Sequence, residues 1–402
     1  MKKILILSEY FYPYNSTGAP KIIGEIAEDL VKKGLSVEVI TSKKNYNAPA
    51  IKNLKKEEIY NGVKINRVWS VNSDKNSKVK RILSYLSLSL SFTRSVLVKK
   101  DYDYLLIFSS PPISTIIGHL ANKIRKKDYA YVVHDLYPEI AYNLNVIKKD
   151  GFIGKIMDYT NKKAFETSKN VIAIGRDMEE VLISKGCKKE KIKVITNWAD
   201  SSYIYPVKKD NRFSREYNLQ DTFNIIYTGN IGRFHDLETL VYTAEELKEY
   251  KNINFIIIGE GYKKEKILNM KKEKNLDNLY ILGYQDSSIY NEVLSTADLL
   301  VSSLEEGVEG LAVPSKTYSY FAANKPVVAI MNESSEIART INENQIGICI
   351  QKNDHKKLAK FIINLNKNKE EYKLMVQRTK VMFDQNYERN IVTDKFKDLI
   401  NS

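Results

Sequence analysis

Short apolar runs alternate with stretches of helical periodicity along almost the whole chain of 402 residues. Runs rich in β-branched and aromatic residues predict buried strands, and apolar residues three and four positions apart predict helices that pack on them. This alternation is typical of parallel α/β sheets with helices on both faces. The expected strands lie at residues 4–7, 36–41, 105–108, 131–133, 171–174, 192–196, 224–227, 254–258, 280–282, 299–302 and 327–330. The expected helices lie at residues 22–33, 113–125, 178–184, 237–249, 265–273, 289–295 and 315–322, with a long, interrupted helical stretch at 356–400.

The chain is too long for one compact core, so two domains are expected. The alternation is interrupted at residues 200–220, which we interpret as the connection between them. The predicted domains are residues 1–200, with about 385–402 crossing back to them, and residues 201–384.

The cysteine content and the apolar runs bear on the cellular compartment. Two cysteines, Cys187 and Cys349, make neither a disulfide framework nor a metal cluster, as in proteins of a reducing compartment. The first residues lead directly into a strand, which predicts no signal peptide, and no apolar run is long enough to span a bilayer. We expect a protein on the cytoplasmic side of the membrane.

The net charge of +14 is confined to the first half of the chain. Residues 1–200 contain 35 Lys+Arg against 21 Asp+Glu, whereas the remainder is balanced. A basic half indicates nucleic acid, anionic lipid or a phosphorylated acceptor as partner. General lysine richness is the alternative, but it would affect both halves, so we favour a surface role.

Residues 304–329 combine three glutamates and two glycines with a predicted helix, preceded and followed by strands. Ser315 is the expected N-cap, and Lys316 adds a positive charge in the first helical turn. A strand, glycine-bearing loop and helix in this order direct backbone N–H groups at an anion. The alternative is a surface loop before an ordinary amphipathic helix.

Other polar and glycine-rich loops also follow predicted strands, where ligands bind in parallel sheets. They comprise a loop with Gly18, residues 134–139, 197–200, 228–236 and 259–261. We expect two sheets that face each other across a cleft holding a phosphate-bearing ligand. Neither glycine cluster in residues 228–236 and 259–261 has dinucleotide-binding spacing, and P-loop, metal-ligand and serine-hydrolase patterns are absent from the sequence.

Residues 78–100 have basic ends and no charge between Ile82 and Thr93. Leucines at helical spacing and weakly polar serines are typical of a helix lying in the headgroup plane of an anionic membrane. The alternative is a core helix of the first domain. The basic excess of this half favours membrane contact.

Several of these motifs, in this order, resemble glycosyltransferase family 4, the retaining sugar-nucleotide-dependent transferases of GT-B fold. The resemblance extends nearly from end to end. It is carried by SSPP, VVHDLYPE, ITNWAD, YTGNIG and VPSKTYSYFAANKPVVA, at residues 109–112, 132–139, 195–200, 227–232 and 313–329. Within the family, the motifs most resemble a bacterial branch that builds capsule, O-antigen or colanic-acid-like polysaccharide. The best-known members that it resembles transfer an N-acetylaminosugar such as N-acetyl-L-fucosamine.

The resemblance implies a GT-B fold of two Rossmann-like domains and assigns roles to the loops. His134, with Asp135, would lie by the donor sugar, Gly18 and Gly229 would border the diphosphate, and residues 283–285 would lie near the base. The loop at Glu309 and Gly310 would hold the sugar. The full set of implied donor-binding residues is Gly18, Asn197, Gly229, Asn230, Gly232, His235, Gly259, Gly283, Tyr284, Gln285, Gly310, Leu311, Ser315 and Ser319.

The sequence departs from the family pattern at the charged positions. Asn230 and His235 stand where many members have an arginine and a lysine that bind diphosphate, so Arg233 and Lys316 are expected to supply the charge. The glutamate pair of the family is replaced by Leu311 and Ser319. The candidates to substitute are Glu305, Glu306 and Glu309, of which we favour Glu309.

The mechanism implied is a retaining transfer in which the leaving diphosphate lies on the face that the acceptor hydroxyl attacks. It requires cations and N–H donors rather than a metal ion or another cofactor. The expected catalytic residues are His134, Asp135, Glu309, Arg233 and Lys316. A buried, hydrogen-bonded histidine is the alternative for His134, and purely structural roles remain alternatives for His235 and Lys316.

The expected substrates are a UDP-sugar and a saccharide on polyprenyl diphosphate at the inner face of the membrane. Two other functions share features with this sequence. A sugar-nucleotide epimerase of the same fold needs acid–base carboxylates at the sugar and no lipid-contacting helix. A basic nucleic-acid-binding protein would explain the charge, but no recognised nucleic-acid module occurs in the sequence.

Overall fold

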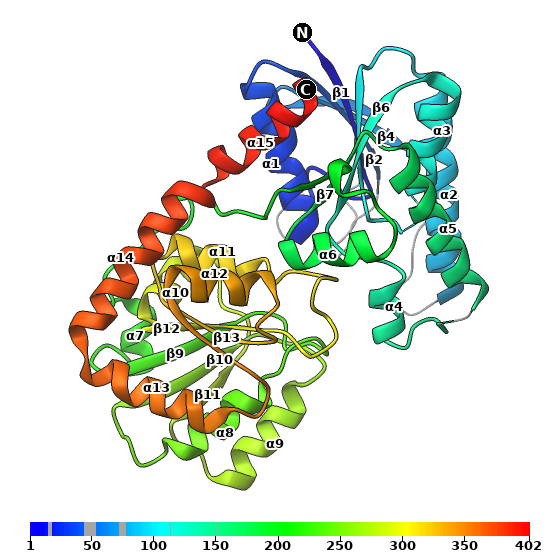
Figure 1. Cartoon of the computed structure of the whole chain (residues 1–402). Helices are drawn as coiled ribbons and strands as arrows, with labels where there is room; N and C mark the ends of the chain where they lie inside the picture. The colour runs from blue at the N-terminus through cyan, green and yellow to red at the C-terminus, as the bar shows by residue number, and fades with distance from the viewer. Residues whose placement is uncertain (15–17, 44–53, 72–77, 113, 150) are drawn as a thin grey trace. The chain divides into compact units, whose positions relative to one another are not determined.

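The computed structural model covers residues 1–402, and the structure describes all of them except residues 15–17, 44–53, 72–77, 113 and 150. The chain forms two compact units. Unit 1 comprises Met1–Thr196, Gly310–Ala312 and Thr393–Ser402, and unit 2 comprises Asn197–Glu309 and Val313–Val392. Each unit is a sheet with helices on its faces, as the alternating sequence predicts (Figure 1).

The sheet of unit 1 has eight strands in the order β3-β4-β2-β1-β5-β6-β7-β8. Neighbours are parallel, except that β3 pairs with β4 in antiparallel fashion at one edge. The central strands are apolar and buried on both faces, as expected of a parallel sheet that helices cover. The strands are β1 Lys3–Ser8, β2 Ser36–Ser42, β3 Glu57–Tyr60, β4 Val63–Val68, β5 Tyr104–Phe108, β6 Asp128–Val133, β7 Asn170–Ala173 and β8 Ile192–Val194.

Helices α2, α3 and α5 lie side by side on one face of this sheet, with α3 in contact with both neighbours (Figure 1). The C-terminal residues 393–402, from helix α15, also belong to unit 1, and Lys33 Nζ lies 2.7 Å from the Asp394 carboxylate. The helices of unit 1 are α1 Gly18–Lys32, α2 Lys78–Val98, α3 Thr115–Arg125, α4 Glu139–Asn143, α5 Phe152–Thr167, α6 Arg176–Ser184 and the short η1 Lys189–Lys191.

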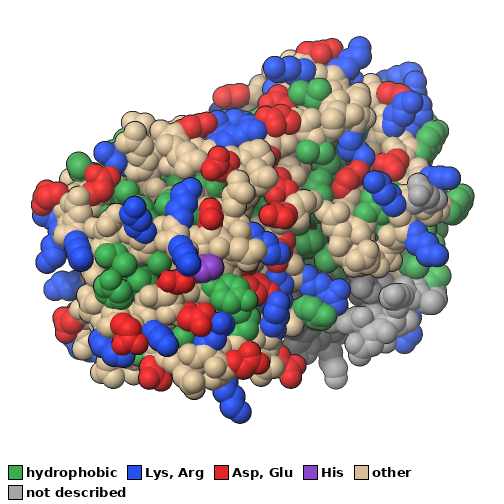
Figure 2. All heavy atoms as spheres, turned by 60° about the horizontal axis from the view of Figure 1, so that its bottom comes forward, with side chains coloured by type: hydrophobic (Ala, Val, Ile, Leu, Met, Phe, Trp, Pro, Cys, Tyr) green, Lys and Arg blue, Asp and Glu red, His purple; other side chains and the backbone are tan. Residues whose placement is uncertain are grey.

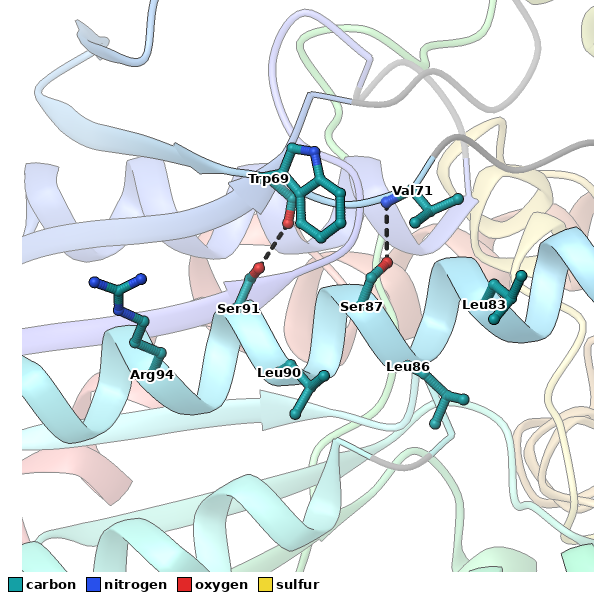
Figure 3. A pocket seen from close by; sticks show the side chains of 8 residues that line it. All are labelled: Trp69, Val71, Leu83, Leu86, Ser87, Leu90, Ser91 and Arg94. Atoms are coloured by element: carbon teal, nitrogen blue, oxygen red, sulfur yellow. Dashed lines mark hydrogen bonds between the residues drawn. The ribbon is translucent and has the colours of Figure 1, made fainter.

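Helix α2 contacts the core and also exposes an apolar face. Its inner side chains Leu88, Phe92 and Val96 are fully buried, which confirms that the segment is a core helix on one side. On the other side Leu90 is 73% exposed, and neighbouring leucines are about half exposed. Ser87 and Ser91 hydrogen-bond to the backbone of the segment after β4, where Trp69 is 70% exposed (Figure 3). Helix α2 and the segment after β4 enclose a shallow groove of about 450 Å³ between them. It is lined by Trp69, Val71, Leu83, Leu86, Ser87, Leu90, Ser91 and Arg94.

The sheet of unit 2 has six parallel strands in the order β11-β10-β9-β12-β13-β14. The strand order changes direction between the neighbours β9 and β12, and the ends of such strands form a crevice where ligands bind in open α/β sheets. A continuous apolar core lies against this sheet and includes Phe255, Ile257 and Val301. The strands are β9 Phe223–Thr228, β10 Ile253–Ile258, β11 Leu279–Leu282, β12 Leu299–Ser303, β13 Val327–Ile330 and β14 Gly347–Ile350.

Residues 197–220 form part of unit 2, which differs from the connection expected at 200–220. Phe213 and Leu219 are fully buried, and Lys209 forms an ion pair with Asp298 at 2.5 Å. The helices of unit 2 are α7 Arg212–Glu216, α8 Glu238–Glu246, α9 Lys264–Lys274, η2 Ser287–Ile289, α10 Tyr290–Thr296, α11 Lys316–Ala322, α12 Glu336–Asn344, α13 His355–Lys367 and α14 Lys369–Asn386, with α15 spanning Arg389–Asn401. No helix in the described part of the chain is long and apolar enough to cross a membrane.

Candidate functional site

Three loops of unit 2 meet at the carboxyl ends of β9, β10 and β12, and glycines allow their close contact. Gly229, after β9, and Gly259, after β10, both have positive φ, of 154° and 152°. A Cβ on Gly259 would lie 1.7 Å from the carbonyl oxygen of Gly229, so any residue with a side chain would clash there. A Cβ on Gly261 would lie 2.5 Å from the backbone of Ile231. These glycines are therefore required for the packing of one loop on the other.

The backbone of residues 229–232 offers fewer free N–H groups than expected. The N–H groups of Gly229 and Ile231 donate to the carbonyls of Ile258 and Glu260, each at 2.8 Å. In the described ranges no acceptor lies in hydrogen-bond range of the N–H groups of Asn230 and Gly232. Only these alternate groups are available to an anion, because the others hold the loop against its neighbour.

Lys316, in the first turn of α11, reaches the same loop. Its Nζ lies 3.0 Å from the position of a Cβ on Gly229, so the ammonium group would contact any larger residue there. Although Lys316 is exposed in part, its surroundings remove enough water to lower its pKa to about 8. The described residues place no carboxylate within ion-pair distance of it. Lys316 is therefore a cation that lacks a counter-ion beside a glycine loop.

Arg233 is oriented by an aromatic neighbour. Its guanidinium carbon lies 3.9 Å from the centroid of the Tyr262 ring, in the loop after β10. This cation–π contact holds an exposed arginine at the rim of the three loops. The sequence pattern gave no sign of Tyr262, since a tyrosine in a polar loop carries no periodic signal.

His235 does not have the geometry expected of a diphosphate ligand. Its Nδ1 lies 2.7 Å from the Ser303 carbonyl oxygen. Burial, with the nearby charges of Lys316 and Lys263, lowers the pKa of His235, so the ring is neutral at neutral pH. A carbonyl only accepts, so Nδ1 carries the proton and Nε2 is an acceptor, which suits a hydroxyl better than a phosphate.

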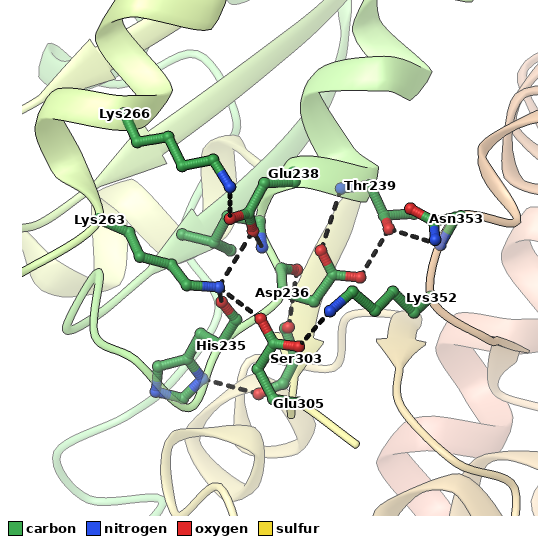
Figure 4. Close-up of polar contacts among 11 residues, drawn as sticks. His235, Asp236, Glu238, Thr239, Lys263, Lys266, Ser303, Glu305, Lys352 and Asn353 are labelled. Atoms are coloured by element: carbon green, nitrogen blue, oxygen red, sulfur yellow. Dashed lines mark hydrogen bonds and ion pairs between the residues drawn. The ribbon is translucent and has the colours of Figure 1, made fainter. Parts of the chain in front are cut away.

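Glu305, one of the three glutamate candidates, belongs to an ion-pair network. One carboxylate oxygen pairs with Lys263 and the other with Lys352 at 2.8 Å (Figure 4). Lys263 Nζ also donates to the His235 carbonyl at 2.8 Å and pairs with Glu238 at 3.2 Å. The network joins the loops after β9, β10, β12 and β14, and sequence reasoning missed it because its members are far apart in the chain.

Within the described ranges, the other glutamate candidates belong to no such network. Glu306 is exposed, and Glu309 accepts a hydrogen bond from the Gly307 N–H at 2.7 Å within its own turn. Gly310 and Leu311 belong to unit 1, where the Gly310 N–H donates to Asp177 at 3.1 Å and the Leu311 carbonyl accepts from the Leu136 N–H at 2.9 Å.

The start of α11 differs in detail from the expected cap. Ser315 is the N-cap residue, but its side chain makes no capping hydrogen bond, and its backbone is already helical. Ser319, which the motif comparison aligns with a family glutamate, is partly buried in the second turn of α11.

The loop after β11 contains Gly283, Tyr284 and Gln285. The Tyr284 side chain is 60% exposed, and the Gln285 amide donates to the Gly283 carbonyl at 3.0 Å. A Cβ on Gly283 would lie 3.3 Å from the Glu260 carboxylate, so this loop adjoins the loop after β10. The ring of an exposed tyrosine offers a flat apolar surface on which another planar ring can stack.

In unit 1 the pair His134 and Asp135 directly follows β6. Both backbone N–H groups donate to the Ser109 hydroxyl, at 3.2 and 3.1 Å, and the His134 ring packs against Phe108. Burial lowers the pKa of His134 to about 4 and raises the pKa of Asp135 to about 6. The histidine is therefore neutral, and the carboxyl group is held where its charge is poorly solvated.

The two remaining candidates lie at the ends of other segments. Gly18 is the first residue of α1 and has a φ of 63°, but the residues just before it lie outside the described ranges. Asn197, the first residue of unit 2, is buried, and its Oδ1 has no hydrogen-bond donor among the described residues. In the same ranges no group of three or more His, Cys, Asp or Glu side chains is placed to hold a metal ion.

Two family models match the chain. The model described as glycosyltransferase family 4 matches residues 16–203, and the model described as glycosyl transferases group 1 matches residues 209–382. These matches define the chain as a glycosyltransferase. More closely, the two matches together cover most of the chain and support a family 4 glycosyltransferase, and its two parallel-sheet units have the GT-B fold.

Relatives and solved structures agree with this assignment. The chain is 28% identical over 369 residues to a protein named "Probable glycosyltransferase WbjE" of Pseudomonas aeruginosa, covering 90% of this chain and 89% of that protein. It is 22% identical over 371 residues to WcaI of Escherichia coli K12, named as a colanic acid biosynthesis glycosyl transferase, covering 87% and 88%. The structure of Anabaena Alr3699/HepE in complex with UDP superposes with a TM-score of 0.74 at 13% identity over all of both chains.

Proposed function

We propose that the protein is a retaining glycosyltransferase that moves an N-acetylaminosugar from a UDP-sugar to a polyprenyl-diphosphate-linked saccharide. The observation that carries this proposal is Lys316, whose ammonium group lies at Gly229 without a counter-ion in the described ranges. A diphosphate beside Gly229 would supply the missing negative charge. The UDP complex of the similar HepE structure and the motif resemblance support UDP as the nucleotide.

In the proposed reaction the bond between the sugar C1 and the leaving phosphate oxygen breaks. The acceptor oxygen bonds to C1 on the same face, and the acceptor proton passes to the leaving diphosphate. Lys316, Arg233 and the N–H groups of Asn230 and Gly232 stabilise the charge that develops there, without a metal ion. Removing one such group costs on the order of 10²–10³ in rate.

The neutral His134 suits the sugar end of the donor. Its low pKa keeps the ring uncharged, so it can hydrogen-bond to a sugar hydroxyl without attracting the diphosphate. Asp135 beside it is the candidate to orient the acceptor. Glu309 remains our candidate for the sugar, because Glu305 is held by two lysines.

The proposed role is synthesis of a cell-surface polysaccharide at the inner face of the membrane. The name of the similar WcaI, which refers to colanic acid biosynthesis, supports this role. The exposed apolar face of α2, with the basic residues at its ends, supports contact with an anionic membrane. The protein would then be a peripheral membrane protein.

On the face of the molecule that Figure 2 shows, basic side chains are scattered among acidic ones. This favours local contacts with lipid or phosphate over one continuous nucleic-acid groove on that face.

The test is UDP release from a panel of UDP-sugars, with and without a lipid-linked saccharide and with EDTA present. We expect release from one UDP-aminosugar, only when the acceptor is added, and a product with the anomeric configuration of the donor. Consumption of donor without acceptor would instead indicate an epimerase. An inverted product would contradict the retaining mechanism.

A further inference from the structure

Helix α5 carries an exposed apolar stripe that no role described so far explains. Phe152 is 79% exposed, Ile153 47%, Ile156 39% and Tyr159 58%. Their spacing places them on one face of the helix. Val146, in the turn before α5, is 57% exposed. Five large apolar side chains are thus exposed within fourteen consecutive residues of the chain. Such a cluster marks an interaction site, whereas single exposed apolar residues are common on any protein surface.

The opposite face of α5 is firmly fixed in unit 1. Asn161 donates to the Tyr137 carbonyl at 2.5 Å, and Ala164 and Phe165 are buried. A Cβ on Gly154 would lie 2.1 Å from the Tyr142 hydroxyl, so the start of α5 packs tightly on α4. The exposed stripe therefore cannot turn inward and is presented to solvent by a rigid helix.

The stripe is bordered by positive charge. Residues 145–163 contain five lysines and two aspartates. Lys148, Lys149 and Lys155 are exposed, and no described carboxylate lies within ion-pair distance of them. A second copy of this chain on the same face would bring like charges together, whereas anionic lipid headgroups would neutralise them.

The stripe on α5 and the exposed face of α2 are on the same side of unit 1. Both helices contact α3, which lies between them (Figure 1). Helices of a parallel sheet run opposite to the strands, so the first turns of α2 and α5 both lie at the carboxyl edge of the sheet. Ile82, Leu83 and Leu86 belong to the first half of α2, and the α5 stripe belongs to the first half of α5. His134 follows β6 at that same edge.

We propose that the α5 stripe, defined as Val146, Phe152, Ile153, Ile156 and Tyr159, is a second lipid-binding surface that lies on an anionic bilayer together with α2. Two separate contacts on one rigid unit fix its orientation, which one helix alone leaves free to rotate about its axis. The orientation directs the carboxyl edge of the sheet, with His134 and Asp135, to the headgroup layer. Such binding is bivalent, so loss of either contact weakens it strongly. The inference extends the membrane contact proposed above for α2.

The test is co-sedimentation of the full chain with vesicles of phosphatidylglycerol and phosphatidylcholine in equal parts. The variant Phe152→Ser/Ile156→Ser removes the centre of the α5 stripe, and Leu86→Ser/Leu90→Ser does the same on α2. The matched control is Leu374→Ser/Val381→Ser on α14 of unit 2, where the original side chains are 44% and 53% exposed. All six positions are exposed, so the fold should survive, and equal thermal unfolding temperatures verify this.

We expect each of the α5 and α2 variants to bind vesicles at least about tenfold more weakly, and the control to change less than about twofold. Replacing Lys148, Lys149 and Lys155 by Ala should cost about fivefold each at low salt. An α5 variant that binds vesicles like the wild type would overturn the inference. So would an α5 variant that changes the oligomeric state while its vesicle binding stays intact.

Transfer to a water-soluble acceptor separates this inference from the proposed function. The α5 variant should keep its kcat/KM on such an acceptor, because none of the substituted residues belongs to the loops that carry the candidate donor-binding residues. If wild-type protein binds vesicles through α5 but transfers no sugar, the proposed function is wrong and the lipid surface stands. If it transfers sugar but binds no vesicles, the reverse holds.

Discussion

Lys316 offers the sharpest test of the donor site, because its protonation should change when a diphosphate binds. In the free protein, desolvation lowers the pKa of Lys316 to about 8. A diphosphate beside the ammonium group favours the charged form and should return the pKa to its ordinary value of about 10.4 or higher. UDP binding must then take up a proton from solvent wherever free Lys316 is partly neutral.

The size of this uptake follows from the pKa. A lysine with a pKa near 8 is about one-tenth neutral at pH 7, half neutral at pH 8 and nine-tenths neutral at pH 9. UDP binding should therefore take up about 0.1, 0.5 and 0.9 protons at these three pH values. The phosphate groups of UDP add little above pH 7.5, since a terminal phosphate has a pKa near 6. Above pH 8 the affinity for UDP should fall by up to tenfold per pH unit.

The assay is isothermal titration calorimetry of UDP binding in buffers of different ionisation enthalpy. Lys316→Met should abolish the uptake at pH 9 and weaken UDP binding about 10- to 100-fold at pH 7. Lys325 is the matched control, because burial also lowers its pKa to about 8. Lys325 precedes β13, at the opposite edge of the sheet, and donates to the Ser295 carbonyl at 3.0 Å. Lys325→Met should keep the uptake, and wild-type protein that binds UDP at pH 9 without proton uptake would refute the reasoning.

Three further changes test the loops and the paired residues after β6. Gly259→Ala should destabilise the protein by at least about 3 kcal/mol in urea unfolding, since its Cβ would lie 1.7 Å from the Gly229 carbonyl oxygen, whereas Gly186→Ala, with open space around it, should cost about 1 kcal/mol. Asp135→Asn should abolish transfer. It should also stabilise the fold by about 1–3 kcal/mol at pH 7.5 but not at pH 4. The pKa of Asp135 is raised to about 6, so the stability of the wild type falls as the pH rises from about 4 to 6 and the asparagine avoids this loss. Lys263→Met should lower the unfolding free energy by about 1–3 kcal/mol, because it removes one of the two lysine partners of each of two partly buried carboxylates, Glu238 and Glu305; an unchanged urea midpoint would contradict the structural role of this network.

The alternating pattern predicted the strands closely because buried parallel strands are continuous apolar runs. The run at 327–330 coincides with β13, and that at 254–258 differs from β10 by one residue. The hairpin β3–β4 was missed, since β3 is an exposed edge strand with charged residues. Helix α5 was missed as well, because the apolar residues on its exposed face obscure a simple amphipathic pattern.

The sequence predicted those residues of the candidate site that are recognisable by their residue type and their place in a loop. A glycine at 229 and a lysine at 316 follow from motif and position, and the structure brings them together. The involvement of Gly229 and Ile231 in loop packing could not be foreseen, because it depends on which way each N–H points. The role of Glu305 depends on lysines about 40 residues distant in the chain, which no local pattern reveals.

The most direct test of the central claim is thermal unfolding of the wild type and Lys316→Met with UDP, GDP, ADP and their sugar conjugates, without magnesium. A ligand that binds only the native state at 100 times its Kd stabilises that state by about 2.7 kcal/mol. We expect the unfolding temperature of the wild type to rise with UDP and further with one UDP-aminosugar. Lys316→Met should lose most of this rise. No rise with any nucleotide, or an equal rise in the variant, would contradict a donor site at Gly229 and Lys316.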